Sequence, residues 1–206
     1  MTIQRANFTR PLIAVAMVAA STFAAVAQKA PVPTRVRGTI ESVDGDVLGI
    51  KTREGSDVKV RMTDNVAVFA VVKTELSQIK EGSYIGVSAM PQPDGTQKAF
   101  AVHIFPENQR GVAEGFLPWD ARANSTMTNA TVAETVKGTD GQNITVKYKG
   151  GEKKIVVGPD SFIGTYVAAD RGDLKPGASV TVTGVGKPGG EVEARRLVID
   201  RTGGGA

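Results

Sequence analysis

The feature that most constrains the fold is a series of short alternating strands separated by turn residues, which occurs twice along the chain. In the first series, residues 39–43 alternate, Asp44-Gly45-Asp46 turns, and residues 47–52 return. Asp-Gly between two alternating segments favours a tight hairpin. Further Gly-containing turns follow at intervals typical of small all-β domains. The sequence therefore predicts an all-β protein.

The two series keep one spacing at two separate places. Lys80-Glu81-Gly82-Ser83 aligns with Lys175-Pro176-Gly177-Ala178, and residues 99–104 align with 194–199, in both cases 95 residues apart. Two anchors that share one offset indicate a duplicated unit. Each unit has five short strands, with one helical turn expected at residues 74–79 of the first, which is the strand order of a small oligonucleotide/oligosaccharide-binding (OB) barrel. We expect two tandem OB-like five-stranded barrels joined by an ordered linker.

Several turn and strand-start residues form a pattern that is found in a known family. In the first copy they are Gly38-Thr39-Ile40, Leu76, Lys80-Glu81-Gly82, Ile85-Gly86-Val87, Gly95 and 99–102, and in the second they are 174–184 and 193–199. This pattern resembles the exported bacterial repeat called the DUF5666 domain, which implies a β-barrel fold and no assigned activity. Some members of that family are labelled metal-transporter permeases, but this sequence has no run after residue 28 long and apolar enough for a spanning helix.

The first 27 residues have the pattern of a cleaved signal peptide. Arg5 and Arg10 form a basic start, residues 11–27 carry no charge, and Ala25-Val26-Ala27 is a small-x-small cleavage site. A retained membrane anchor is the alternative, although the uncharged run is short and rich in Ala. We expect a periplasmic or secreted protein after cleavage near Ala27.

The remaining chain divides by composition into five parts. A flexible leader is expected at 28–35, because Pro31 and Pro33 interrupt a segment without periodicity. The first barrel repeat is expected at 36–105, the linker at 106–129 and the second repeat at 130–201. Residues 202–206 are expected to be a disordered tail.

Charge and cysteine content exclude several classes of partner and chemistry. Without Arg5 and Arg10, 23 basic residues face 21 acidic ones, and they are interspersed, so no basic track for nucleic acid is expected. The chain has no Cys, which excludes disulfides and thiolate chemistry. The partner is expected to be a small molecule, a glycan or a protein, with no cofactor and no membrane-spanning segment in the mature chain.

The linker and the strand before it contain the candidate ligand-binding residues, including the only His and the only Trp. Alternation places His103 on the face opposite Val102 and Ile104, which points it away from the barrel core if those two face inward. Trp119 offers a stacking surface for a ligand, or else closes the open end of a barrel. The candidates are His103, Glu107, Trp119 and Asp120.

The same segment has residues suited to a metal site, which is the second hypothesis. His103, Glu107, Glu114 and Asp120 supply nitrogen and oxygen ligands of the kind that Zn or Mn accepts. Only one imidazole is present, and a covered structural His is the simpler interpretation. This reading predicts a metal-handling accessory protein.

A hydrolase is the third hypothesis. Ser125 or Thr126 with His103 and Asp120 has the residue types of a triad, but no nucleophile-elbow sequence surrounds them. The glycine pattern of residues 184–189 matches a dinucleotide fingerprint, but Pro188 prevents the helix that such a site requires. The sequence therefore favours a non-catalytic binding or envelope-associated protein.

Overall fold

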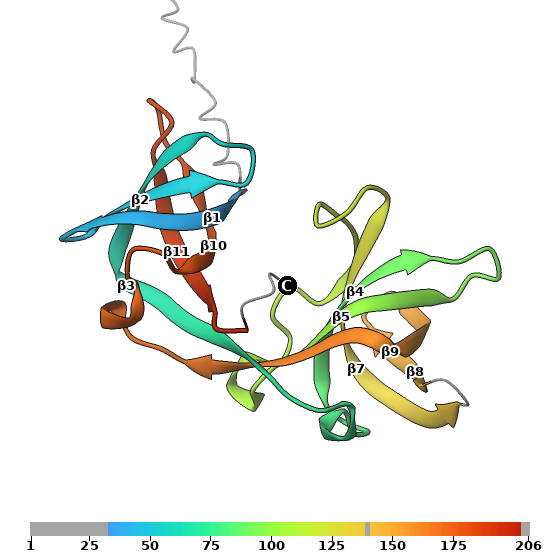
Figure 1. The fold of residues 1–206 in the computed structure, drawn as a ribbon. Coiled ribbons are helices and arrows are strands. Elements are labelled where there is room, and N and C mark those ends of the chain that lie inside the picture. Colours follow the sequence, from blue (N-terminus) through green and yellow to red (C-terminus); the bar gives the residue numbers. More distant parts are fainter. Residues whose placement is uncertain (1–32, 139–140, 203–206) are drawn as a thin grey trace, which may run out of the picture. The chain divides into compact units, whose positions relative to one another are not determined.

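The computed structural model describes residues 33–138 and 141–202, which are drawn in colour in Figure 1. The expected signal peptide, the leader up to residue 32, residues 139–140 and the expected tail from residue 203 lie outside the described residues. The described chain is all-β, as predicted. Its elements are β1 (Pro33–Asp44), β2 (Val47–Thr52), β3 (Asp57–Lys73), η1 (Leu76–Gln78), β4 (Tyr84–Pro91), β5 (Gln97–Ile104), η2 (Glu107–Gln109), β6 (Gly115–Trp119), β7 (Ser125–Gly138), β8 (Gly141–Tyr148), β9 (Gly151–Ala168), η3 (Arg171–Asp173), β10 (Ser179–Gly186) and β11 (Val192–Asp200).

Five strands form a closed barrel. β1 pairs with β2 and β10, β2 pairs with β3, and β10 pairs with β11, all antiparallel. The parallel pair of β11 with β3 closes the ring. Alternate residues of these strands point inward and form one apolar core, which includes Ile40, Leu48, Ile50, Val60, Val182 and Leu197.

The other strands surround a second apolar core. β7 pairs with β4 and β8, β8 with β9, and β4 with β5 in antiparallel ladders, while β5 and β9 are parallel. β6 adds to the outer edge of β7. The core residues include Ile85, Val87, Val102, Val132, Ile144, Val146 and Ile155.

The strand groups do not follow the expected repeat boundaries at 36–105 and 130–201. β4 and β5 follow β3 in the chain but pair with β7 and β9, whereas β10 and β11 pair with β1 and β3. The two C-terminal hairpins of the expected repeats are thus exchanged. The closed barrel is built from both ends of the described chain, and the second group is the continuous middle.

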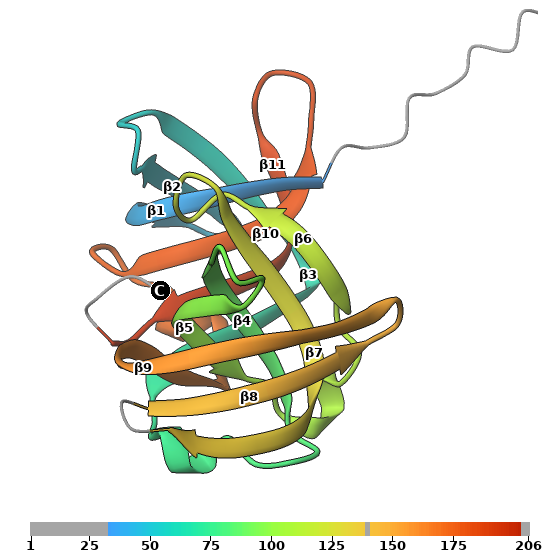
Figure 2. The same ribbon diagram turned by 90° about the vertical axis from the view of Figure 1, so that its right-hand side faces the viewer.

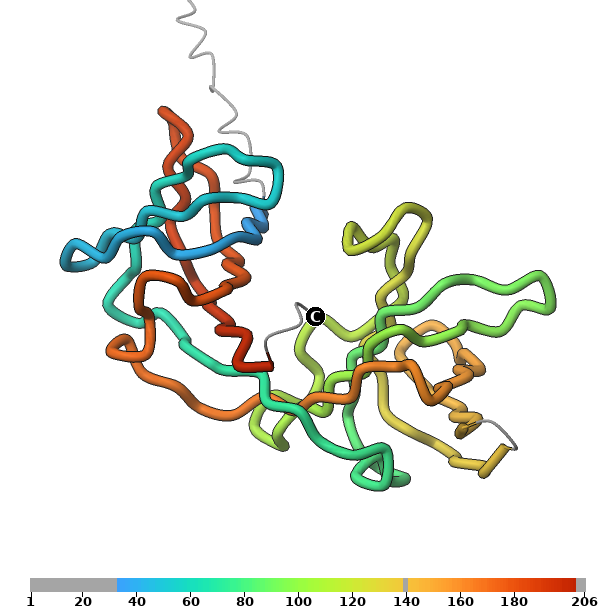
Figure 3. Tube along the Cα trace, in the orientation of Figure 1, coloured from blue at the N-terminus to red at the C-terminus, as the bar shows by residue number. Residues whose placement is uncertain are grey.

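Two long strands account for this exchange. β3 has 17 residues and β9 has 18, beyond the usual strand length of roughly 3–10. Their first parts belong to different cores, and their last residues pair with each other over 69–73 and 164–168. Figure 3 shows the trace passing between the two strand groups along these segments. Because each of these strands extends beyond its own strand group, the hairpin that follows it pairs with strands of the other group.

The two exchanged hairpins share the bounds of their first strand and the place of one register shift. β4 and β10 begin and end 95 residues apart, at 84–91 and 179–186. Each hairpin has a register shift, between Ser88 and Ala89 in one and between Thr183 and Gly184 in the other, again 95 residues apart.

The expected linker is partly strand. Residues 115–119 form β6, which pairs with the first five residues of β7 (Figure 2). The period-two pattern is weak there, because Gly115 and Pro118 interrupt it. The leader also ends earlier than expected, since Pro33 to Arg35 already pair with β10. The single helical turn expected after β3 is the 3-10 turn η1.

No helix within the described residues has the length and apolar character needed to cross a membrane.

Candidate ligand-binding site

A cavity of about 270 Å³ lies between the outer faces of the two strand groups. On β11, Leu197 and Ile199 point into the core, so Arg196, Val198 and Asp200 point the other way. The same alternation turns residues of β1, β4, β5, β7 and β10 toward the cavity. The lining residues are Arg35, Arg37, Val71, Gly86, Ser88, His103, Phe105, Val112, Ala113, Leu117, Trp119, Ala121, Met127, Asn129, Tyr166, Thr181, Thr183, Arg196, Val198 and Asp200.

One side of the cavity is formed by two arginines of β1 and the tip of the β6–β7 hairpin. Arg37 donates from Nη2 to Asp120 Oδ1 at 2.8 Å, and Arg35 reaches the same oxygen at 3.4 Å. The Arg35 guanidinium also lies 4.1 Å from the centre of the Trp119 ring, a cation–π contact. The hydrogen bond from Arg37 is the main cause that lowers the pKa of the Asp120 carboxyl below its usual value. One carboxylate therefore neutralises one of two neighbouring positive charges.

Arg196 supplies a third guanidinium. It is partly buried and lies over the rings of Phe69 and Tyr166, at 4.5 and 5.0 Å. Its Nη1 donates to the neutral Oε1 of Gln109 at 2.9 Å, and among residues 33–138 and 141–202 no carboxylate forms an ion pair with it. Burial lowers the pKa of Arg196, although its intrinsic basicity keeps it charged at neutral pH.

His103 lines the cavity from β5 as a buried neutral imidazole. It stacks on Tyr166 with ring centres 5.4 Å apart and meets Phe162 at 5.6 Å. Loss of hydration on burial lowers its pKa to about 4, with Asp200 opposing that shift. Val102, on the opposite face, belongs to the apolar core. His103 thus contributes a flat, uncharged surface.

The loop before β6 covers one edge of the cavity. The carbonyl oxygen of Val112 accepts hydrogen bonds from the Tyr84 hydroxyl at 3.0 Å and from Asn129 Nδ2 at 3.2 Å. The Oδ1 atom of Asn129 is buried and has no hydrogen-bond partner within the described chain. Val112 and Leu117 are 41% and 53% exposed. They are two of the four large apolar side chains found exposed among the described residues, and both line this cavity.

The four candidate metal ligands are not brought together. Glu107 is exposed and paired with Arg110, and Glu114 accepts a hydrogen bond from the backbone of Lys149. Asp120 is held by the arginines, and His103 is surrounded by aromatic rings. Within residues 33–138 and 141–202, no three His, Asp or Glu side chains are placed to hold a metal ion.

The residues of the candidate triad are also separated. The Ser125 hydroxyl donates to carbonyl oxygens of Trp119 and Arg122 at 3.1 and 2.8 Å, which closes the β6–β7 turn. Thr126 is paired with the Gln97 side chain at 2.9 Å. His103 lies two strands away and level with Asn129, about 13 Å along β7 from Ser125 at the usual rise per residue. These hydroxyls have structural roles.

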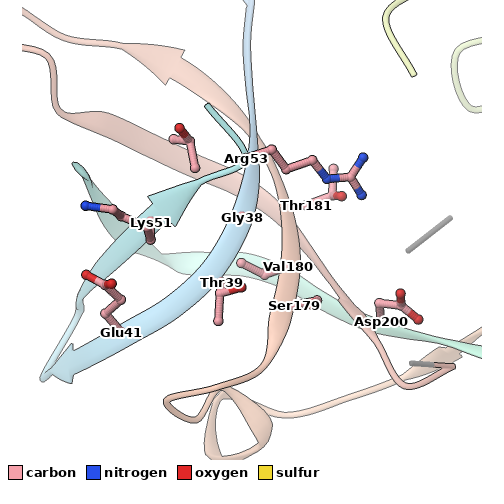
Figure 4. Close-up of a pocket in the computed structure, with 10 residues that line it drawn as sticks. Gly38, Thr39, Glu41, Lys51, Arg53, Ser179, Val180, Thr181 and Asp200 are labelled. Atoms are coloured by element: carbon pink, nitrogen blue, oxygen red, sulfur yellow. The ribbon is translucent and has the colours of Figure 1, made fainter. Parts of the chain in front are cut away.

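A second hollow lies on the outside of the closed barrel, along β1, β2 and β10. Figure 4 shows its charged side chains spread apart, with Glu41 and Lys51 at one end and Arg53 and Asp200 at the other. Lys51 is already paired with Asp57 at 2.8 Å. The lining includes no aromatic ring. The cavity between the strand groups is the better candidate site.

Of the four residues proposed for ligand binding, the structure brings His103 and Trp119 into the cavity lining and Asp120 beside it, whereas Glu107 lies outside it. Sequence reasoning missed Arg35, Arg37, Tyr166 and Arg196. The alternation of β1 and β11 does mark the arginines as facing away from the core. The alternation does not reveal that the outer faces of the two strand groups meet. That meeting depends on the exchanged pairing of the hairpins, which is a feature of the tertiary structure.

Comparison of the chain with protein-family models, with curated proteins and with solved structures finds no match.

Proposed function

We propose that this is an exported, non-catalytic binding protein, built from two OB-like barrels whose outer faces enclose one ligand site. The cavity of about 270 Å³ carries the proposal, because it gathers guanidinium groups, aromatic rings and exposed apolar side chains from distant parts of the chain. Concave sites of this kind, apolar with a few convergent polar groups, are where small ligands bind.

The OB-like description of both strand groups is supported by their pairing order. In each group a strand pairs with two antiparallel neighbours, and one parallel contact closes the ring, between β3 and β11 or between β5 and β9. That order is typical of OB barrels. The constant spacing of 95 residues between the β4–β5 and β10–β11 hairpins, with its matching register shifts, supports their origin as copies of one unit.

A binding role is supported over catalysis by the surroundings of each reactive side chain. The Ser125 hydroxyl is used in a turn, and the His103 imidazole lies between aromatic rings. General acid–base chemistry needs such groups within hydrogen-bond reach of one another. Export is supported by Arg5, Arg10 and the Ala25-Val26-Ala27 motif. N-terminal sequencing of the protein recovered from the periplasm should give Gln28.

Ligand binding is tested by intrinsic fluorescence, since Trp119 is the only Trp and lines the cavity. A library of small organic acids, amides, amines and sugars is titrated into the mature protein at 295 nm excitation. We expect at least one class to change the emission saturably and to raise the melting temperature. If no compound of any class does so, the proposed function is wrong.

A further inference from the structure

We propose that the cavity selects small organic carboxylates with an apolar or aromatic body, and that Arg196 is the residue that binds the carboxylate. This inference rests on the proposed function and narrows it to one chemical class of ligand. It follows from two features of the lining: its charge and its apolar rings.

The cavity is lined by three guanidinium groups and by one carboxylate, Asp200, which acts on His103. Arg35 and Arg37 share Asp120, whereas Arg196 is partly buried and, within the described part of the chain, donates to the neutral amide oxygen of Gln109 and forms no ion pair. A guanidinium has five N–H donors in a fork that matches a carboxylate, and one bond to Gln109 leaves donors unused. The flanking rings of Phe69 and Tyr166 hold its plane in place, so little side-chain freedom is lost on binding. The site is prepared for one anionic group.

The remaining surface suits an apolar body. Phe105, Leu117, Met127 and Val198 line the cavity together with the rings of Trp119 and His103. Leu117 is half exposed, so an apolar ligand that covers it would remove apolar surface from water, which favours binding. His103 is uncharged at neutral pH, so it does not offer the carboxylate a second positive charge beside Arg196.

The asymmetry between the two copies supports a dedicated site. At the proposed spacing of 95 residues, Arg196 corresponds to Ala101 and Val198 corresponds to His103. The anion-binding group is therefore present in one exchanged hairpin only. A feature needed for the barrel itself would be expected in both.

The test compares matched compounds on the full mature protein. Phenylacetate, cyclohexanecarboxylate and hexanoate are titrated against their neutral amides and against phenethylamine, with Trp119 fluorescence as the readout. We expect the acids to bind at least about tenfold more tightly than the amides, as is usual for a hydrogen bond to a charged group, and the amine not to bind.

Substitutions at two neighbouring positions, 195 and 196, supply the matched control. Arg196→Gln should weaken phenylacetate binding roughly tenfold or more, and Arg196→Lys, which keeps the charge but not the fork, should weaken it less. Arg195→Gln removes the same charge one position away, on the exposed side of β11, and should leave the affinity within about twofold. Unfolding curves of all three variants establish that they are folded.

The outcomes separate this inference from the proposed function. Amides that bind as tightly as the acids, or equal losses in Arg195→Gln and Arg196→Gln, would overturn the carboxylate assignment and leave a binding protein of other specificity. If Arg196→Gln does not fold, Arg196→Lys decides, because unchanged acid selectivity in that variant would overturn the role of the fork. Failure of every acid and every amide to bind would overturn both.

Discussion

At the scale of single residues, burial sets the pKa of His103, and close packing sets which residue fits at position 38. His103 is 7% exposed and surrounded by Phe162 and Tyr166, so its charged form is disfavoured. Gly38 lies where β1 passes from β10 to β2, and its neighbours leave no room for a side chain. Each position gives a prediction that a single substitution can test.

The titration of His103 should make stability depend on pH in a defined window. The folded imidazole stays neutral down to a pKa of about 4, whereas the unfolded chain takes up the proton near 6.5. The unfolded state then binds more protons, so the free energy of unfolding should fall as the pH drops from about 6.5 to about 4, by up to about 3 kcal/mol. Urea unfolding at several pH values measures this slope. Because His103 is the only His, His103→Gln should remove it, and an unchanged slope would contradict the assignment.

Replacement of Gly38 by Ala should destabilise the closed barrel. A Cβ atom there would lie 2.0 Å from the backbone oxygen of Lys51. Overpacking of this kind typically costs about 1–3 kcal/mol, and a rigid backbone neighbour places the cost at the upper end. Gly158→Ala is the matched control, since nothing lies within 4 Å of its Cβ position. Equal unfolding free energies for the two variants, measured in urea, would argue against the described approach of β1 and β2.

At the scale of elements, the β6–β7 hairpin is held against β1 by charge and by a ring. Asp120 accepts hydrogen bonds from Arg35 and Arg37, and Trp119 lies beneath Arg35. The hairpin itself is short, with five paired residues in β6. A short hairpin depends on contacts of this kind to keep one position. The shape of the cavity on this side therefore depends on Asp120.

The substitution Asp120→Ala should loosen the hairpin tip without unfolding the protein. The carboxylate is more than half exposed, so we expect a stability loss below about 1 kcal/mol. Trp119 should become more accessible, with red-shifted emission and stronger quenching by acrylamide. Glu107→Ala removes an exposed ion pair within residues 106–129, away from Trp119, and should leave quenching unchanged. Quenching that is the same in both variants would show that Asp120 does not position the hairpin.

At the scale of the whole molecule, the exchange makes the closed barrel depend on both ends of the chain. Residues from β10 and β11, among them Val180, Val182 and Leu197, share its core with residues of β1, β2 and β3. The second core, by contrast, draws on the continuous stretch between η1 and the middle of β9. Loss of β10 and β11 at the C-terminal end should therefore destabilise β1 and β2 at the N-terminal end.

A chain truncated after residue 170 distinguishes exchanged from independent repeats. Without β10 and β11, the edges of β1 and β3 are unpaired and their core is incomplete, so we expect β1 and β2 to lose hydrogen-exchange protection. The amides of β5, β7 and β8 should remain protected, because all their partners are retained. Heteronuclear NMR of the truncated and complete chains measures both. Independent repeats would give the opposite result, with the first repeat intact and the second disrupted.

The sequence by itself determined the all-β class, most of the strands and turns, and the face on which each strand residue lies. These are local properties: Gly in turns such as Gly82 and Gly177, both with positive φ, and alternation along β5 or β11 act within a few residues. The position of His103 opposite Val102 followed from alternation alone. The predicted strand content was wrong where Gly115 and Pro118 weakened the pattern of β6, and at Pro33 to Arg35, which were expected to belong to the leader.

Only the tertiary structure decided which hairpin closes which ring, and with it the cavity. The same apolar pattern on β4–β5 and on β10–β11 satisfies either core, so the sequence leaves their partners open. The lengths of β3 and β9 select the exchanged arrangement, because each strand extends beyond its own core before the chain turns. Arg35, Trp119 and Arg196, far apart in the chain, then line one cavity, since burial against a partner depends on distances that no local pattern encodes.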